Sequence, residues 1–574
     1  MTAASHGLRV SGRAAGARAG GVLGAGLLVI LLLLVLVPLV VLVRTGLAPA
    51  GTLPFETARL TLDNFVQLFA RPDTGILVRN TLVYATGTVA FAGTVGLVLA
   101  WLTERTDMPG RVAVRIVLLS WLAVPPLVIG FGWILLINPG NGALNVLARW
   151  LTDGAFSFEL YSMSALIVIT GLAQAPTAFV MIAGLMRNMD PQLENAARLS
   201  GAGGVAVARH VTLPLLKPGL VSITIFLFMS VVQTFDLPAI IGLTARIPVF
   251  STRVYLLSSA DMGIPNYGLS AALGVLLLVF AALLIQLYFR YQRQGERYQV
   301  VGGRAFRPGR VRLGPWRWLA LGLVCVYLLV SIAPVLILGW TSLLPFYQAP
   351  SLAALDRLTL AGFARVLNEP LVLRGLTNTV ILTLVSATAV MALGFVVAWH
   401  SVRTQGRLAR LIDLLAFVPA AVPPIVVVIA LLVLYIPTPL YGTIWLIVLA
   451  HVSVYVAFGA RTMTGAVAQL HKELGDAALV SGAGTWTTLT RVVLPLVRSQ
   501  ILNGWLWVAA HSARDLTAPL MLMTSGSMVA ASVVWIKWDL PDLPGASAVS
   551  VLLVAGLLAV VVPIQILTSR GMDE

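Results

Sequence analysis

The sequence predicts an all-α membrane protein with twelve transmembrane helices, arranged as two parallel repeats of six. The first observation is composition: 59% of the 574 residues are hydrophobic and only 10% are charged, whereas soluble domains are about a quarter charged. The second is a set of twelve apolar runs of roughly 20 residues, the length that crosses a bilayer as a helix. The third is a series of short motifs that recur at a nearly constant offset.

The apolar runs follow one another with short polar connections, which leaves no room for a large soluble domain. Cys325 is the single cysteine, so disulfides within the chain and a cysteine metal site are excluded, and we expect it to be a small core residue. In order, the runs lie near 22–43, 80–102, 115–137, 161–186, 217–243, 268–289, 318–341, 377–400, 411–436, 441–460, 500–524 and 546–568.

The repeat divides the chain into two halves. Asn80-Thr81 returns as Asn378-Thr379, and further matches hold the same offset of 298 before it falls to 281. The outer loop that begins near Asn138 is therefore 17 residues longer in the first half. Six spans in each half place both copies in the same orientation. The expected organisation is a basic, disordered N-terminus (1–21), a first half (22–289), a basic linker (290–317) and a second half (318–574).

The net charge of +16 lies on one side of the predicted topology. Assigning alternate loops to each side places the whole excess on the side that holds the two termini, the linker 290–317 and the loops 105–115, 187–217, 403–410 and 461–498. The positive-inside rule makes that side cytoplasmic. Topology and contact with anionic membrane lipid account for the basic residues, so we expect no nucleic-acid partner.

Two polar segments, 188–216 and 467–499, interrupt the apolar runs on the predicted cytoplasmic side. In the first, Leu193, Ala196, Ala197 and Ser200 share one face of a helix, and the second repeats this spacing. The glycine that follows each face permits a sharp turn with positive φ, and the later proline suits the first turn of the next helix. Each segment therefore predicts a short helix, a glycine turn, a second short helix and then a membrane span.

These segments resemble the EAA loop of ABC importer permeases, the loop that docks on the ATPase subunit. Asn195 stands where the family usually has Glu, with Glu194 just before it. The alternative is a pair of ordinary helical loops flanking the membrane. The docking residues implied by the resemblance are Glu194, Asn195, Ala196, Ala197, Gly201, Leu213 and Pro214 in the first copy, and Asp476, Ala477, Ala478, Gly482, Leu494 and Pro495 in the second.

Two further stretches, 233–255 and 514–522, resemble ferric-iron ABC importer permeases, although Asp515 stands where that family often has Glu. The resemblance implies a type I importer fold, an inner-membrane location with both termini cytoplasmic, and ferric-iron uptake. It also implies an extracytoplasmic solute-binding protein and two copies of an ATPase subunit as partners. ATP would bind to that subunit, and this chain would hold no cofactor. Permeases for thiamine, polyamines or phosphonates share much of the pattern and remain alternatives.

Prolines and polar residues inside the apolar runs are candidates for the substrate path. Intramembrane polar groups are costly and indicate function, and a proline within a span breaks the helix where a cavity or neighbours satisfy the backbone. For the prolines, including Pro176, the alternative is a kink that serves packing alone. For the polar residues, the alternative is an ion pair at a helix end in the water of the outer loops. The candidates are Pro125, Pro126, Gln233, Asp236, Pro423, Pro424, His511, Arg514 and Asp515.

The chain lacks the motifs of an enzyme. No phosphate-binding Gly-x-x-x-x-Gly-Lys-Ser/Thr loop occurs, and only three lysines exist. We found no catalytic constellation and no metal-ligand motif, so catalytic and metal residues are predicted to be absent and ATP hydrolysis is assigned to a separate subunit. A secondary transporter is the rival of another class, but it would not need the duplicated cytoplasmic loop. The expected mechanism is alternating access driven by closure of the ATPase subunits.

Overall fold

The computed structural model describes residues 21–52, 56, 58–187, 192–259, 264–296, 311–404, 406–471, 473, 478, 481, 484 and 487–573. Within this part of the chain, nine helices are long and apolar enough to cross a membrane. Three bent helix pairs raise the number to twelve when each pair counts as one span. The predicted all-α fold with up to twelve spans is therefore confirmed.

The chain forms two compact units that do not follow the sequence halves. Unit 1 comprises Met1–Gln67, Leu257–Leu278 and Leu376–Val529, and unit 2 comprises Leu68–Leu256, Val279–Gly375 and Ala530–Glu574. Each unit therefore takes segments from both halves of the sequence.

Unit 2 is built on the middle spans of the first half. The long helices α4 and α8 pack along each other, and α14 packs against α6. Any side chain on Gly132 of α6 would collide with the backbone of Pro334 in α14, so glycine permits this close approach. The helices are α4 (Asp73–Arg105), α5 (Arg111–Trp121), α6 (Pro126–Ile137), α7 (Ala143–Leu151), α8 (Met163–Arg187), α9 (Gln192–Leu199), α10 (Gly204–Val207), η2 (Ala208–Thr212), α11 (Leu213–Gln233), η3 (Pro238–Gly242) and most of α12 (Phe250–Ser258).

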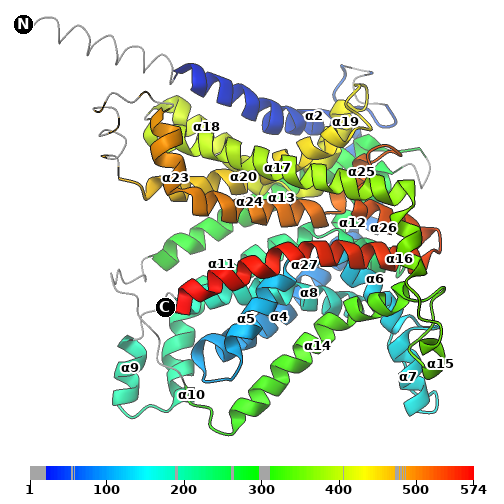
Figure 1. The fold of residues 1–574 in the computed structure, drawn as a ribbon. Helices are drawn as coiled ribbons and strands as arrows, with labels where there is room; N and C mark the ends of the chain where they lie inside the picture. The colour runs from blue at the N-terminus through cyan, green and yellow to red at the C-terminus, as the bar shows by residue number, and fades with distance from the viewer. Residues whose placement is uncertain are drawn as a thin grey trace, which may run out of the picture. The chain divides into compact units, whose positions relative to one another are not determined.

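The second half of the sequence contributes the remaining helices of unit 2. The last helix, α27, packs against α14, α26 and α5. Within this unit, α9 and α10 lie at one end of the long helices, whereas α7 and α15 lie at the other (Figure 1). These helices are α14 (Trp316–Ser342), α15 (Leu352–Leu355), α16 (Ala361–Leu367), α26 (Ala530–Asp539) and α27 (Leu543–Asp573).

Unit 1 combines the first span with the middle spans of the second half. Leu27, Leu31 and Val35 of the first span form one buried cluster with Val397 and Val456. The described helices are η1 (Leu32–Leu36), α2 (Val37–Gly46), α3 (Asp63–Ala70, ending in unit 2), α13 (Tyr267–Glu296, up to Leu278), α17 (Pro370–Arg403, from Leu376), α18 (Arg407–Phe417), η5 (Val418–Ala421), α19 (Pro424–Tyr435), α20 (Ile444–Ala468), η6 (Thr488–Val493), α23 (Leu494–Leu496), α24 (Arg498–Arg514) and α25 (Thr517–Leu522).

The proline pairs break two spans as predicted. Helices α5 and α6 meet at 101° around Pro125 and Pro126, and α18–η5 meets α19 at 106° around Pro423 and Pro424. The prediction for Pro176 was wrong, because α8 continues through this residue from Met163 to Arg187. A third bend of 72° separates the helix ending at Leu496 from α24.

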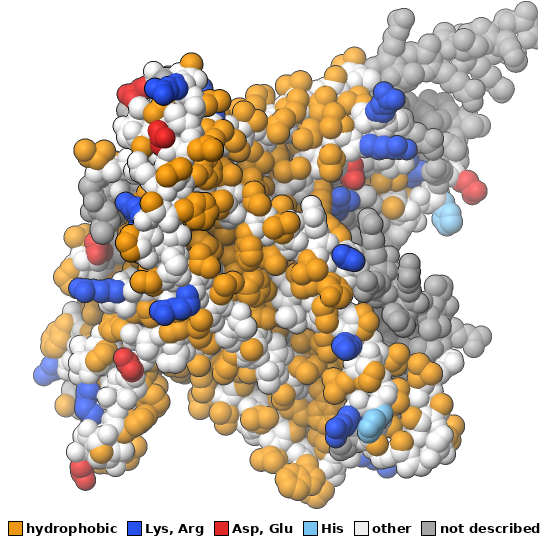
Figure 2. All heavy atoms as spheres, turned by 180° about the vertical axis from the view of Figure 1, so that it is seen from behind, with side chains coloured by type: hydrophobic (Ala, Val, Ile, Leu, Met, Phe, Trp, Pro, Cys, Tyr) orange, Lys and Arg blue, Asp and Glu red, His pale blue; other side chains and the backbone are white. Residues whose placement is uncertain are grey.

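The outer faces of the spans are apolar. Hydrophobic side chains gather along the bodies of the long helices, and most charged side chains lie near helix ends (Figure 2). Cys325 of α14 is exposed, which corrects its predicted core position. An exposed apolar side chain on a membrane helix faces lipid or a partner without the penalty that water would impose.

The linker is shorter than the sequence indicated. Helix α13 continues to Glu296, and α14 begins at Trp316. Residues 297–310 lie outside the described part of the chain. Val311 forms an isolated bridge with Thr106, at the end of α4, so the described end of the linker is attached to unit 2.

Candidate functional site

The first polar segment folds as a helix, a glycine turn and a second helix. After α9, Gly201 adopts φ +86°, and α10 and η2 then lead into α11. The predicted local structure of this copy, including the positive φ, is confirmed. Leu213 and Pro214 form the first turn of α11, as the sequence predicted.

In the second copy, three of the six docking residues predicted from the sequence fall outside the described residues. They are Asp476, Ala477 and Gly482. Ala478 is half-buried. Leu494 and Pro495 form the short helix α23, which is followed by the bend at Val497 rather than by a continuous span. The two copies therefore differ where the membrane helix begins.

Glu194 fixes α9 to the body of unit 2. Its side chain is only 4% exposed and its Oε2 lies 3.0 Å from Nη1 of Arg105, the last residue of α4. Thr212 donates a hydrogen bond of 2.6 Å to the other carboxylate oxygen. Arg105 also donates to the Met186 carbonyl at 2.7 Å. The carboxylate therefore points into the unit, which differs from the surface position that the sequence implied.

The opposite face of α9 is apolar and open. Leu193 is 51% exposed and Leu199 is 90% exposed. A groove of about 480 Å³ runs beside Leu193, where Pro214 and Leu215 of α11 form another wall. Large apolar side chains exposed together beside a groove are typical of a protein-binding surface. The Asn195 side chain is not described; Ala196 is exposed and Ala197 half-buried.

Two of the candidate substrate-path residues, Gln233 and Asp236, lie together in unit 2. Gln233 is the last residue of α11, and Asp236 follows it as a buried side chain that is 8% exposed. Tyr84 of α4 is fully buried nearby and its hydroxyl lies 3.3 Å from Thr170. Ser251 donates to the Thr234 carbonyl and holds this turn against α12. The path role of the two residues stays a prediction.

His511, Arg514 and Asp515 lie in unit 1, at the end of α24. The His511 ring stacks on Trp507 with ring centroids 3.7 Å apart. Asp515 accepts backbone hydrogen bonds from Thr517 and Ala518 and so caps α25. Its Oδ2 also lies 3.2 Å from Nε2 of the buried His451. Asp515 thus has a structural role in α25, and its path role stays a prediction.

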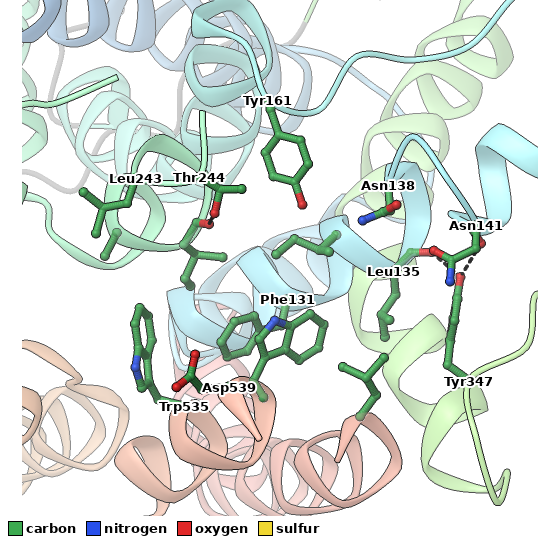
Figure 3. Close-up of a pocket in the computed structure, with 15 residues that line it drawn as sticks. Phe131, Leu135, Asn138, Asn141, Tyr161, Leu243, Thr244, Tyr347, Trp535 and Asp539 are labelled. Carbon is green, nitrogen blue, oxygen red and sulfur yellow. Dashed lines mark hydrogen bonds between the residues drawn. The ribbon is translucent and has the colours of Figure 1, made fainter. Parts of the chain in front are cut away.

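Unit 2 contains a pocket that the sequence did not reveal. It has a volume of about 560 Å³ and opens beside α6 and the loop after it. Phe131 stacks on Trp538 with ring centroids 4.0 Å apart. The Tyr161 hydroxyl, the Asn138 amide and the Asp539 carboxylate point toward the hollow (Figure 3). Aromatic walls with a few converging polar groups are typical of a small-ligand site.

The two tyrosines of the pocket remain neutral donors. Burial raises the pKa of Tyr161 and outweighs the hydrogen bond with Asn138 that lowers it. Burial likewise raises the pKa of Tyr347 to about 12. Tyr347 donates to the backbone carbonyls of Leu135 and Asn141, at 2.6 and 3.0 Å, and holds the loop after α6 in place.

The charge of the pocket is negative. Among the described residues that line it, Asp539 is the one carboxylate and neither Lys nor Arg occurs. No group of three or more His, Cys, Asp or Glu in the described part of the chain could hold a metal ion. Sequence signals for the pocket did exist, namely the Trp535 and Trp538 spacing of one helix face and the extended loop at Asn138.

Comparison with known proteins identifies a family. The model of the "binding-protein-dependent transport system inner membrane component" family matches residues 92–295 and again residues 390–571. A Haemophilus influenzae protein named as a ferric transport system permease, FbpB 1, is 24% identical over 82% of this chain and 76% of that protein. The sn-glycerol-3-phosphate permease UgpA of Escherichia coli is 28% identical over 43% of this chain and 84% of UgpA.

Solved structures include a bacterial alginate ABC transporter in complex with an alginate-bound periplasmic protein. One of its chains aligns with a TM-score of 0.37 and 18% identity, covering 42% of this chain and 85% of that one.

Proposed function

The chain belongs to the family of inner-membrane components of binding-protein-dependent transport systems, and we propose that it forms the ferric-iron path of an ABC importer. The single observation that carries the proposal is the double family match, because each copy contains one of the two polar segments. In the first copy the structure adds α9, a short helix anchored by a buried ion pair with its apolar face open. We assign this face to the ATPase subunit.

The orientation follows from charge. The basic linker and the α9 end of unit 2 face the cytoplasm under the positive-inside rule. The opposite end of unit 2, with α7 and α15, then faces outward (Figure 1). A solute-binding protein would dock on that outward side, and the pocket beside the loop after α6 would receive the released solute. ATP would bind only to the partner subunits, and this chain would contribute no cofactor.

The pocket favours a cationic solute. Asp539 provides the one negative charge among the described residues that line the pocket, and opposite charges attract more strongly where the surroundings exclude water. An anion such as a phosphonate would meet no Lys or Arg among the described lining residues. Thiamine and polyamines are also cationic, so the charge of the pocket does not distinguish them from iron. Iron is favoured because the relative that aligns with 82% of this chain is named as a ferric transport permease.

The ATPase assignment is tested with Leu199→Glu. Leu199 is 90% exposed, so the variant should fold normally, because exposed substitutions usually change the unfolding free energy by about 0.5 kcal/mol or less. If Leu199 is buried by the partner, losing that burial costs about 1.5–3 kcal/mol and lowers affinity roughly 10- to 100-fold. We expect the purified variant to lose the co-expressed ATPase subunit in a pull-down assay.

Leu352→Glu is the matched control. Leu352 lies in α15 at the opposite end of unit 2 and is 85% exposed. This variant should retain the ATPase as the unaltered chain does. Equal retention by both variants would reject the assignment of α9 as the docking surface.

The cation assignment is tested with Asp539→Asn. Asp539→Asn removes the one carboxylate among the described residues that line the pocket, so uptake of ⁵⁵Fe by cells at subsaturating iron should fall. Asp356→Asn is the control, because Asp356 is exposed after α15 and does not line the pocket. Uptake that is equal in the two variants would contradict a role for the carboxylate.

A further inference from the structure

A second cavity lies at the α9 end of unit 2. It is a groove of about 700 Å³ between the C-terminal end of α4, Met186 at the end of α8, the start of α11 and the start of α14. Its walls are almost entirely apolar and include Trp101, Leu102, Leu216 and Leu319. Under the orientation proposed above, all four helix ends lie at the cytoplasmic side of the membrane.

The groove is held in shape by the end of the linker. Val311 donates to the Arg105 carbonyl at 2.8 Å and accepts from the Asp107 amide at 3.2 Å. The Leu313 amide donates to the Asp107 carboxylate at 2.8 Å. These bonds fix the start of α14 against the end of α4. The two walls of the groove that α4 and α14 form therefore keep a constant distance from each other.

The chemistry of the walls selects the occupant. Apart from the indole N–H groups of Trp101 and Trp316, Thr212 carries the one polar group among the lining side chains, and its hydroxyl already donates to Glu194. An extended peptide segment would leave backbone amides and carbonyls without partners in such a groove, at a cost of several kcal/mol for each group. A hydrocarbon chain has no polar group to satisfy and is present at this depth in the membrane.

The rim is basic. Arg312 and Arg317 are exposed and flank the lining residues Leu313 and Trp316 in the chain. Trp316 is 69% exposed, as expected for an indole at the boundary between lipid and water. Basic pockets on the cytoplasmic side of membrane helices attract anionic headgroups.

We propose that this groove binds one acyl chain of an anionic phospholipid of the cytoplasmic leaflet, with the headgroup at Arg312 and Arg317. The lipid would steady α9, because Thr212 and Met186 line the groove and also bind Glu194 and Arg105. The inference uses the orientation of the proposed function and adds a lipid requirement to it. Lipid binding can be measured without the ATPase or iron, so its failure is distinguishable from failure of the transport assignment.

The test compares two tryptophan substitutions on α4. Val98 lines the groove and is 38% exposed, whereas Val83 is 47% exposed and does not line it. The full chain is purified in detergent with phosphatidylglycerol or phosphatidylcholine, and retained lipid is counted by native mass spectrometry. We expect one phosphatidylglycerol to be retained by the unaltered chain and by Val83→Trp, and to be lost from Val98→Trp because the indole fills the groove.

The headgroup and the coupling to α9 are tested separately. Arg312→Gln with Arg317→Gln should remove the preference for phosphatidylglycerol over phosphatidylcholine, whereas Arg290→Gln, at the exposed end of α13, should preserve it. Hydrogen exchange of residues 192–199 should slow when phosphatidylglycerol is added to the unaltered chain, but not in Val98→Trp. Equal retention by Val98→Trp and Val83→Trp, or exchange that is insensitive to the lipid, would overturn the proposal.

Discussion

Replacing Glu194 by Gln should release α9 while the rest of unit 2 stays folded. The side chains of Glu194 and Arg105 are 4% and 3% exposed, with 3.0 Å between the paired atoms. The variant keeps the shape of the side chain but leaves the Arg105 charge buried without its carboxylate. Removing one partner of a buried pair costs about 3–5 kcal/mol. We use the lower end of this range because Arg105 keeps its hydrogen bond to the Met186 carbonyl.

Hydrogen exchange measures this loss locally. Each 1.4 kcal/mol corresponds to a tenfold change in the protection factor against exchange. A loss of about 3 kcal/mol therefore lowers the protection factor of residues 192–199 by roughly two orders of magnitude. If their protection factor in the unaltered chain is smaller than that, the protection disappears. Exchange in α8 should change little, because its contacts with α4 do not involve the carboxylate. The ATPase should dissociate in parallel, since its proposed docking surface becomes mobile.

Two controls separate the buried charge from a general effect of substitution. Glu104→Gln removes a neighbouring carboxylate that pairs with Arg115, and it should leave the exchange of 192–199 unchanged. The double variant Arg105→Gln with Glu194→Gln should exchange more slowly than either single variant, because it leaves no unpaired buried charge. Two results would refute the claim that the buried ion pair anchors α9. One is unchanged exchange in Glu194→Gln. The other is a double variant in which residues 192–199 lose as much protection as the two single variants lose together.

Two further perturbations follow from local geometry. Gly201 has φ +86° and open space around it. Replacing it by Ala should lower the stability of this turn by about 1–2 kcal/mol through the backbone alone, and Val should lower it more. Transport and ATPase retention should therefore fall in the order Gly, Ala, Val, while the amount of protein in the membrane stays normal. For Asp542, burial would raise the pKa, but hydrogen bonds from Lys537 and Gly545 and the charges of Lys537 and Arg365 lower it. The stability that this carboxylate contributes is therefore present above the ordinary pKa of about 3.9 and is lost as pH falls through the lower folded-state value. The thermal unfolding temperature should therefore fall as pH is lowered from 7 to 3. Asp542→Asn should make the unfolding temperature depend less on pH.

The parts of the fold that the sequence predicted are those set by local chemistry. Apolar runs of sufficient length specify spans regardless of their neighbours. Pro125-Pro126 and Pro423-Pro424 break their helices because a second proline removes another backbone donor and fixes φ at the same place. A single proline removes only one donor, and α8 accommodates Pro176 without a break. The helix and glycine turn before Pro214 followed from periodicity and from the freedom of glycine.

The parts that escaped prediction depend on residues far apart in the chain. Arg105 and Glu194 are separated by 89 positions, and no pattern in the sequence indicates that they meet. The pocket joins distant segments in the same way: the spacing of Trp535 and Trp538 marks one wall, but nothing in the sequence pairs that wall with Phe131 of the first half. Side chains of these types occur throughout membrane helices, so only the packing of distant segments distinguishes a site from an ordinary surface.

The exchange of spans between the sequence halves has a consequence for synthesis. Val35 belongs to the first span, and its native neighbour Val397 emerges from the ribosome about 360 residues later, which at roughly 5–20 residues per second takes about 20–70 s. Throughout that interval the first span resides in the bilayer with only lipid or provisional neighbours against its future contact face. Joining both halves in one polypeptide keeps the late partner tethered nearby, so that completion of unit 1 is an intramolecular step whose rate does not depend on the concentration of a second protein.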